Sequence, residues 1–152
     1  MRQTHGFTLI EILIVMGLIA ILASSVLVAI NPARQFAQAR NTQRVSNIHA
    51  ILNALSTRMA ENRGLLAGTG DCPGDIPIDA VRIAARQFDL RSCLVPLYIA
   101  ELPVDPSVGI TGEDYDTGYT IVRDTASGRL TICAPAAAEA SIEDSEPYCV
   151  TR

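Results

Sequence analysis

A long apolar run with one acidic residue near its start is the feature that most constrains this chain. Residues 7–30 form this run of 24 residues, and its polar members are Thr8, Glu11, Ser24 and Ser25. As an α-helix with a rise of about 1.5 Å per residue, the run spans roughly 36 Å, which is enough to cross a bilayer with some tilt. An ionised acid costs about 2.5 kcal/mol or more at the centre of a bilayer and less toward its edge. We therefore expect Glu11 to have a partner.

The residues at the start of the run resemble the processing site of type IV pilins and type II secretion pseudopilins. The matching residues are Gly6, Phe7, Thr8, Leu9, Ile10 and Glu11, followed by the apolar helix. The resemblance implies that a prepilin peptidase removes a class III-type leader, residues 1–6, by cutting between Gly6 and Phe7. It also implies N-methylation of Phe7, and pairing of Glu11 with the N-terminal ammonium of a neighbouring subunit during assembly. Two buried charges that are each costly alone are tolerated as a pair.

A cleaved secretory signal and a plain uncleaved anchor are the other interpretations of this run. A secretory signal has a basic start, an apolar core of about 7–15 residues and a small-residue cleavage site. Arg2 and Ala23-Ser24-Ser25 have these features, but the apolar core is too long and contains Glu11. Arginines lie on both sides of the run, so the positive-inside rule does not decide its orientation. The resemblance places residues 1–6 in the cytoplasm.

The length and the resemblance together predict an anchor followed by one small domain. The implied fold is α+β and pilin-like, with a long N-terminal helix packed on a small antiparallel β-sheet. Its membrane half is residues 7–30 and its amphipathic half is residues 31–63. Residues 64–152 form an extracytoplasmic globular head.

Charge is distributed unevenly between these parts. Residues 1–63 hold six arginines and two acids, net +4, and residues 64–152 hold six arginines and fourteen acids, net −8, which together give the net charge of −4. An acidic head argues against nucleic-acid binding by that part. We expect the arginines after the apolar run to be solvated or to face other subunits, with an anionic lipid surface as the alternative partner.

The helix is expected to continue beyond the membrane half. Asn31-Pro32 kinks or interrupts it, and Gly64 ends it. His49 flanks an apolar stripe and is expected to pack there rather than to act as a ligand. The stripe residues recur at helical spacing and are Phe36, Val45, Ile48, Leu52, Leu55 and Met59.

The sequence pattern of the predicted head, residues 64–152, predicts short helices and strands separated by loops. Residues 79–90 suit a helix capped by Asp79, and residues 94–102 suit a second helical piece broken near Pro96. Residues 119–123 and 130–134 alternate as strands around a turn, and residues 148–151 suit a third strand. Residues 136–146 are expected to form an exposed excursion.

All four cysteines lie in the predicted head, where an even number in a small exported domain indicates disulfides. Three pairings of Cys72, Cys93, Cys133 and Cys149 exist, and the simplest joins neighbours in sequence. The second neighbour pair resembles the C-terminal disulfide of many type IV pilins. No Cys-x-x-Cys motif occurs, which argues against a zinc site.

One acidic loop is a candidate for calcium. Leu102-Pro103-Val104-Asp105-Pro106 resembles the Leu-Pro-x-Asp-Pro segment of major pseudopilins, in which the following loop can bind calcium. The candidate ligands are Asp105, Glu113, Asp114 and Asp116, because carboxylate oxygens suit a hard cation. The aromatic and Gly-Asn-Pro pattern that usually follows is missing, and a solvated acidic turn is the alternative.

The sequence holds no recognisable catalytic set, so we do not expect an enzyme. The resemblance predicts a structural subunit of a type IV pilus-like filament; the alternatives are a major pseudopilin of a type II secretion system and a filament-tip adhesive or DNA-uptake pilin. The implied partners are identical or related pilin subunits, prepilin peptidase, an inner-membrane assembly platform and, before assembly, membrane lipid. The implied location is the inner membrane as a single-pass protein, followed by a cell-surface or periplasmic filament.

Overall fold

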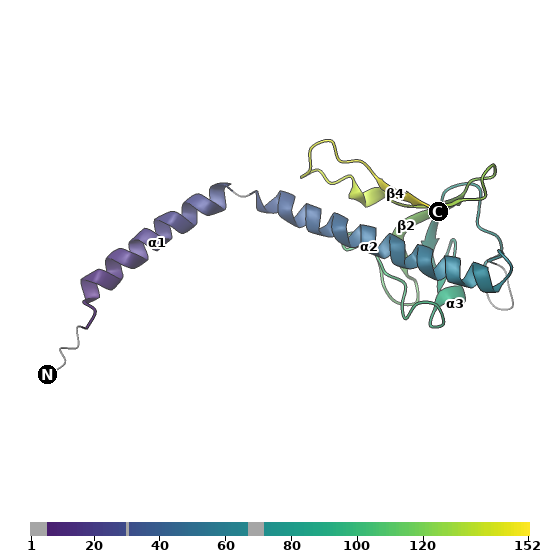
Figure 1. The fold of residues 1–152 in the computed structure, drawn as a ribbon, viewed down its shortest axis with the longest axis horizontal. Coiled ribbons are helices and arrows are strands. Elements are labelled where there is room, and N and C mark those ends of the chain that lie inside the picture. Colours follow the sequence, from purple (N-terminus) through teal and green to yellow (C-terminus); the bar gives the residue numbers. More distant parts are fainter. Residues whose placement is uncertain (1–5, 30, 67–71) are drawn as a thin grey trace. The chain divides into compact units, whose positions relative to one another are not determined.

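A computed structural model describes residues 6–29, 31–66 and 72–152 of the chain. Residues 1–5 of the expected leader, Ile30 and part of the loop after Gly64 lie outside the described residues. The chain divides into two compact units, Met1–Phe36 and Ala37–Arg152, which Figure 1 draws in sequence colours.

Helix α1, Leu9–Ala29, occupies most of the first unit. Its first backbone hydrogen bond joins the amide of Ile12 to the carbonyl of Thr8. The helix is continuous through Gly17 and the serine pair. The hydroxyl groups of Ser24 and Ser25 each donate to a carbonyl three residues earlier, at 2.8 Å. Their hydroxyl groups are thus satisfied without water.

Helix α2, Pro32–Glu61, begins at a well-formed N-terminus. The side chain of Asn31 accepts a hydrogen bond from the amide of Arg34 at 3.2 Å, and Pro32 takes the first helical position, where a missing amide hydrogen costs nothing. Asn31-Pro32 therefore starts a second helix. At the other end, the amide of Gly64 donates to the carbonyl of Met59 at 2.7 Å. Arg63, with φ 59°, takes the left-handed position before Gly64, as in a Schellman motif.

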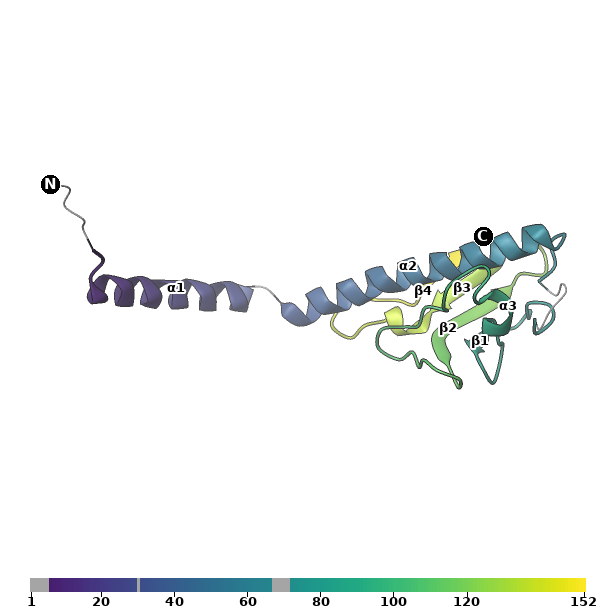
Figure 2. The same cartoon turned by 90° about the horizontal axis from the view of Figure 1, so that it is seen from below.

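The sheet has four antiparallel strands in the order β1-β2-β3-β4. The strands are β1 Val81–Ala84, β2 Asp116–Arg123, β3 Leu130–Ala134 and β4 Tyr148–Thr151. Figure 2 shows one face of this sheet lying along α2. The predicted strands at residues 119–123, 130–134 and 148–151 are confirmed, although β2 starts earlier, at Asp116.

The core lies between this face of the sheet and α2. Alternate residues of β2 and β3, including Tyr119, Ile121 and Ile132, are fully buried. Helix α2 contributes Ile48, Ile51, Leu52, Ala54 and Leu55 to the same cluster. The predicted stripe is thus correct in its centre, but Phe36 stays 67% exposed. The α+β, pilin-like fold is confirmed: an apolar helix and a second helix precede a small antiparallel sheet.

The predicted helix over residues 79–90 is wrong. The chain forms β1 and a turn there, because Val81 and Arg82 pair with Ile121 and Thr120 of β2. The hydroxyl of Thr117 also donates to the carbonyl of Ile83 at 2.8 Å. The periodicity of an apolar segment this short fits a helix and a strand equally well. Pairing with β2 therefore determines that the segment forms a strand.

The second predicted helical piece is displaced. Helix α3 is short, Arg91–Leu94, and precedes most of the predicted range. The hydroxyl of Tyr115 accepts hydrogen bonds from the amides of Leu90 and Arg91, so a residue distant in sequence caps this turn.

The excursion after β3 is less exposed than predicted. It begins with a 3-10 helix, η1, Pro135–Ala137. Ala137 is 2% exposed, and Glu139 forms ion pairs with two arginines of α2. Contacts with the helix therefore hold the first part of this segment in place.

Candidate assembly segment and buried arginine cluster

The first candidate site is the segment before and inside the first turn of α1. Gly6, Phe7 and Thr8 lie outside regular structure, and Phe7 is 81% exposed. Thr8 precedes the helix and its hydroxyl accepts a hydrogen bond from the amide of Glu11 at 3.3 Å. The carboxylate of Glu11 in turn accepts from the amide of Thr8, with a nitrogen–oxygen distance of 3.5 Å.

This reciprocal pair is a capping box, in which a threonine and a glutamate three residues later satisfy the free amides of a helix start. It gives Glu11 a local role that the sequence analysis missed, although Thr8-Leu9-Ile10-Glu11 has the required spacing. The cap uses one oxygen of the carboxylate, and among the described residues no cation pairs with Glu11. Glu11 thus orders its own helix start and stays available to a positive group.

The described side chains of α1, Leu9–Val26, are apolar except for Glu11, Ser24 and Ser25. Among the described residues, Leu9–Val26 is the one helical segment long and apolar enough to cross a membrane, with a mean hydropathy of 2.6, and none of it is buried. Large side chains such as Leu9, Ile21 and Leu22 are at least 65% exposed. A helix that is apolar all round requires either lipid or other helices around it.

The second candidate site is centred on Arg44, whose side chain is fully buried. Its five N–H groups are matched by oxygens of four residues, which with Arg44 we call the Arg44 cluster. The Nε atom donates to Asp105 at 2.7 Å, and Nη2 donates to Asp105 and Ser107 at 3.1 and 2.6 Å. Nη1 donates to Asn41 and Glu139, at 2.7 Å in each case.

The Arg44 cluster ties two loops of the head to one helix. Asp105 belongs to the loop before β2, and Glu139 belongs to the segment after η1. Arg40, one turn before Arg44, adds a two-point contact with Glu139, in which Nε and Nη2 each donate at 2.7 Å. The expectation that these arginines are solvated or face other subunits is therefore wrong for Arg44.

The electrostatic environment keeps both carboxylates ionised. Burial alone would raise the pKa of Asp105, but hydrogen bonds from Arg44 and from Ser107 outweigh it and lower the pKa to about 2. Hydrogen bonds from Arg40 and Arg44 lower the pKa of Glu139 to about 2 as well. The cluster is thus an ionic contact over the whole physiological pH range.

Two glycines close around Asp105. Gly118 has φ 80°, and a Cβ atom there would lie 2.8 Å from the Cβ of Asp105. A Cβ at Gly109 would lie 2.6 Å from the carbonyl oxygen of Asp105. Neither position has room for a side chain, so the loop fits closely around the buried carboxylate.

A second arginine of α2, Arg58, is also buried, with 5% exposure. It donates to the carbonyl oxygens of Leu66 and Cys93, at 3.2 Å each. Its guanidinium carbon lies 5.6 Å from the ring centre of Tyr98. Arg58 thus satisfies two buried carbonyl groups, one in the loop after α2 and one in α3. This corrects the expectation that it is solvated or subunit-facing.

The four acids proposed as calcium ligands have separate surroundings. Asp105 binds Arg44, Asp114 pairs with Arg86 at 2.9 Å, and Asp116 pairs with Arg82 at 2.9 Å. Glu113 is exposed. Within the described residues no three His, Cys, Asp or Glu side chains are grouped as metal ligands would be. The structure therefore does not bring the calcium candidates together.

The cysteines form two disulfides, Cys72–Cys93 and Cys133–Cys149. The first joins the loop after α2 to α3. The second joins two residues that lie directly opposite each other on β3 and β4, with a Cα–Cα distance of 4.0 Å. It closes the segment that carries Glu139.

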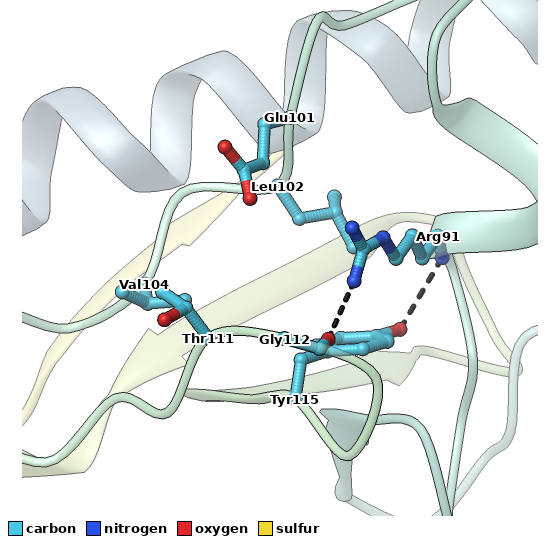
Figure 3. Close-up of a pocket in the computed structure, with 7 residues that line it drawn as sticks. All are labelled: Arg91, Glu101, Leu102, Val104, Thr111, Gly112 and Tyr115. Atoms are coloured by element: carbon cyan, nitrogen blue, oxygen red, sulfur yellow. Dashed lines mark hydrogen bonds between the residues drawn. The ribbon is translucent and has the colours of Figure 1, made fainter.

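A small cavity beside α3 has room for about one water molecule, about 10 Å³. Figure 3 shows Arg91 crossing it toward the carbonyl of Gly112, while the backbone amide of Arg91 donates to the hydroxyl of Tyr115. Burial and a hydrogen bond to Asp89 raise the pKa of Tyr115. The cavity is too small for a ligand.

Comparison with known proteins gives one match. Residues 1–27 match the family model of the prokaryotic N-terminal methylation motif, which is the class III leader of type IV pilins and pseudopilins. No curated protein and no solved structure matches the chain.

Proposed function

We propose that this chain, which carries the N-terminal methylation motif of type IV pilins and pseudopilins, is a structural subunit of a type IV pilus-like filament. Type IV pilins and pseudopilins have a structural role. The observation that carries the proposal is the position of Glu11. It lies in the first turn of a helix whose other described side chains are apolar apart from two serines, five residues after Gly6.

Processing is the first step of the proposed function. A prepilin peptidase hydrolyses the peptide bond between Gly6 and Phe7, which releases residues 1–6 and leaves a free amine on Phe7. The exposed, non-helical backbone at Gly6 and Phe7 supports access by a protease. Methylation of the amine keeps its positive charge at neutral pH.

Assembly is the second step. Each incoming copy brings the ammonium of Phe7, and Glu11 of an existing copy neutralises it as both groups leave water. The largely apolar surface of α1 supports this step, because lipid covers it before assembly and neighbouring copies of the helix cover it afterwards. In this proposal, the protein is a single-pass inner-membrane protein first and a filament subunit later.

The head is the part that faces the outside of the filament. Two disulfides and the Arg44 cluster support a rigid head attached to α2. The C-terminal disulfide favours a pilus subunit, and Leu102-Pro103-Val104-Asp105-Pro106 favours the alternative, a major pseudopilin of a secretion system. In the alternative the same processing and assembly steps apply to a periplasmic filament.

Intact mass of the purified protein tests the proposal. We expect the mass of residues 7–152 with one added methyl group and no free thiol. Gly6→Val should leave the full-length precursor in the membrane, whereas Thr4→Val, two residues earlier in the leader, should still be cut. A mature protein that begins at Met1, or one cut near Ala23, would reject the proposal.

A further inference from the structure

The sheet of the head has β1 and β4 as its outer strands, and the chain itself covers the edge of β1. The amide of Arg82 donates to the side-chain oxygen of Gln87 at 3.3 Å. The carbonyl of Arg82 accepts from the amide of Phe88 at 3.3 Å. The turn after β1 therefore occupies this edge, whereas an uncovered edge strand can pair with another chain.

The outer edge of β4 is open. Leu130 and Arg152 exchange both backbone hydrogen bonds, at 2.8 Å each. In an antiparallel pair, residues that bond to the partner strand alternate with residues that do not. Cys149 and Thr151 therefore direct their amide and carbonyl groups away from β3. Both residues are exposed, and within the described part of the chain no hydrogen bond reaches these backbone groups.

Side-chain contacts hold β4 in its extended conformation. Cys149 forms a disulfide with Cys133 on β3. The hydroxyl of Thr151 lies 2.8 Å from the hydroxyl of Thr131, also on β3. A partner strand therefore meets an edge that is already ordered, so that pairing costs little conformational entropy.

We propose that this edge pairs with β4 of a second copy of the chain, antiparallel and about a two-fold axis at Val150. The axis places Cys149 of each copy opposite Thr151 of the other. Both residues direct their backbone groups outward, so each opposed pair exchanges both of its hydrogen bonds. The contact uses the same surface on both copies and is thus isologous.

The side chains of β4 match this register. The two Val150 side chains meet at the axis as an apolar pair. Tyr148 of each copy lies opposite Arg152 of the other, so that an aromatic ring that is 38% exposed faces a cation. The strand contains neither lysine nor proline, which are residues that protect many edge strands from pairing. The edge is therefore complementary to itself.

The two-fold axis reverses the direction of α2 between the two copies. Neighbouring subunits in a filament of the proposed kind are related head to tail and point the same way. The β4 contact therefore joins copies of different filaments, or copies that are not yet assembled. It adds an interaction surface beyond the proposed function and does not depend on that function.

Cysteine cross-linking of the purified full chain in detergent tests the register. All four native cysteines form disulfides, so an added cysteine supplies the free thiol. Val150→Cys should give a disulfide-linked dimer on non-reducing gels, because the two Cα atoms would lie about 4.5 Å apart. Tyr148→Cys is the matched control. Tyr148 is more exposed than Val150, but its two copies would lie at least about 13 Å apart, beyond the reach of a disulfide. No dimer from Val150→Cys, or an equal amount from Tyr148→Cys, would overturn the proposal.

A second substitution in the Val150→Cys chain tests the backbone pairing. Thr151→Pro removes the outward N–H group and leaves the bonds between β3 and β4 in place, so the yield of dimer should fall about tenfold. Thr151→Val loses the same hydroxyl but keeps the N–H group, so it should still cross-link. Equal yields from these two variants would overturn the pairing, provided that peptide mapping finds both native disulfides in each. The measurement needs no filament, so its failure would leave the proposed function standing.

Discussion

The guanidinium of Arg44 lies 2.7 Å from the carboxylate of Asp105, a residue 61 positions later, and both side chains are fully buried. Removing one member leaves the other as an uncompensated buried charge, which costs about 3–5 kcal/mol. We expect Arg44→Ala to lower the free energy of unfolding by this amount. Urea unfolding of the mature protein in detergent, followed by circular dichroism, measures it.

The matched control is Arg86→Ala. Arg86 pairs with Asp114 at 2.9 Å, but both side chains are more than 70% exposed. An exposed pair of this kind contributes about 0–1 kcal/mol. If Arg44→Ala destabilises the protein no more than Arg86→Ala, the Arg44 cluster does not hold the head together.

The lowered pKa values of Asp105 and Glu139 predict how stability depends on pH. Both fall from ordinary values of 3.8 and 4.5 to about 2. Because the folded state holds these groups ionised, their contribution is fully present above about pH 5 and is lost as the pH falls toward 2. Urea unfolding across this range should show stability falling with acid in the wild-type protein.

The Arg44→Ala variant supplies the comparison for that pH series. Without Arg44 the pKa of Asp105 should rise, so its stability should fall less steeply over the same acidic range. An identical pH dependence in the two proteins would place the acid sensitivity elsewhere in the head.

Glu11→Gln separates the two roles of Glu11. Glutamine can keep the capping box with Thr8, but it has no charge to offer the ammonium of Phe7. We expect the variant to insert and to be processed normally, and to form few or no filaments, since an unpaired buried charge costs about 3–5 kcal/mol per subunit. Electron microscopy at matched expression counts the filaments.

Thr8→Val is the control for Glu11→Gln, because it removes the cap that Thr8 provides and keeps the carboxylate of Glu11. Loss of an N-cap costs about 0.5–2 kcal/mol, so this variant should assemble better than Glu11→Gln. Normal filament number in Glu11→Gln would show that the charge does not recruit the next subunit.

The disulfide between β3 and β4 should stabilise the head more than it aids membrane insertion. Closing a loop of this size contributes about 3 kcal/mol. Replacing Cys133 and Cys149 together by serine should lower the free energy of unfolding by about that amount and leave membrane retention unchanged. An unaltered unfolding midpoint, or loss of the protein from the membrane fraction, would contradict this expectation.

Local patterns were sufficient to predict much of this fold. The apolar run predicts α1, and the alternation of residues 130–134 and 148–151 predicts β3 and β4. Each pattern is contained in a short stretch of chain and depends on one buried face. The candidate residues Gly6, Phe7 and Glu11 came from a motif of the same local kind.

The predictions that were wrong concern features that depend on contacts between residues distant in sequence. Residues 79–90 look helical alone, and it is β2 that selects a strand for Val81–Ala84. Arg44 is one of several arginines on a polar helix, and nothing near it in sequence marks it as buried. Its partners, Asp105 and Glu139, come from two different loops, so the Arg44 cluster exists only in the folded chain.

The order of the strands has a consequence for how the head folds. Because β1-β2-β3-β4 in space repeats the order along the chain, each strand pairs with the one made just before it. Pairings between neighbours along the chain close shorter loops and favour faster folding. The head can therefore build its sheet strand by strand in the order of the chain. The contact between Arg44 and Asp105 joins residues that are distant in sequence. We therefore expect it to form late, after the loop that carries Asp105 has packed against α2.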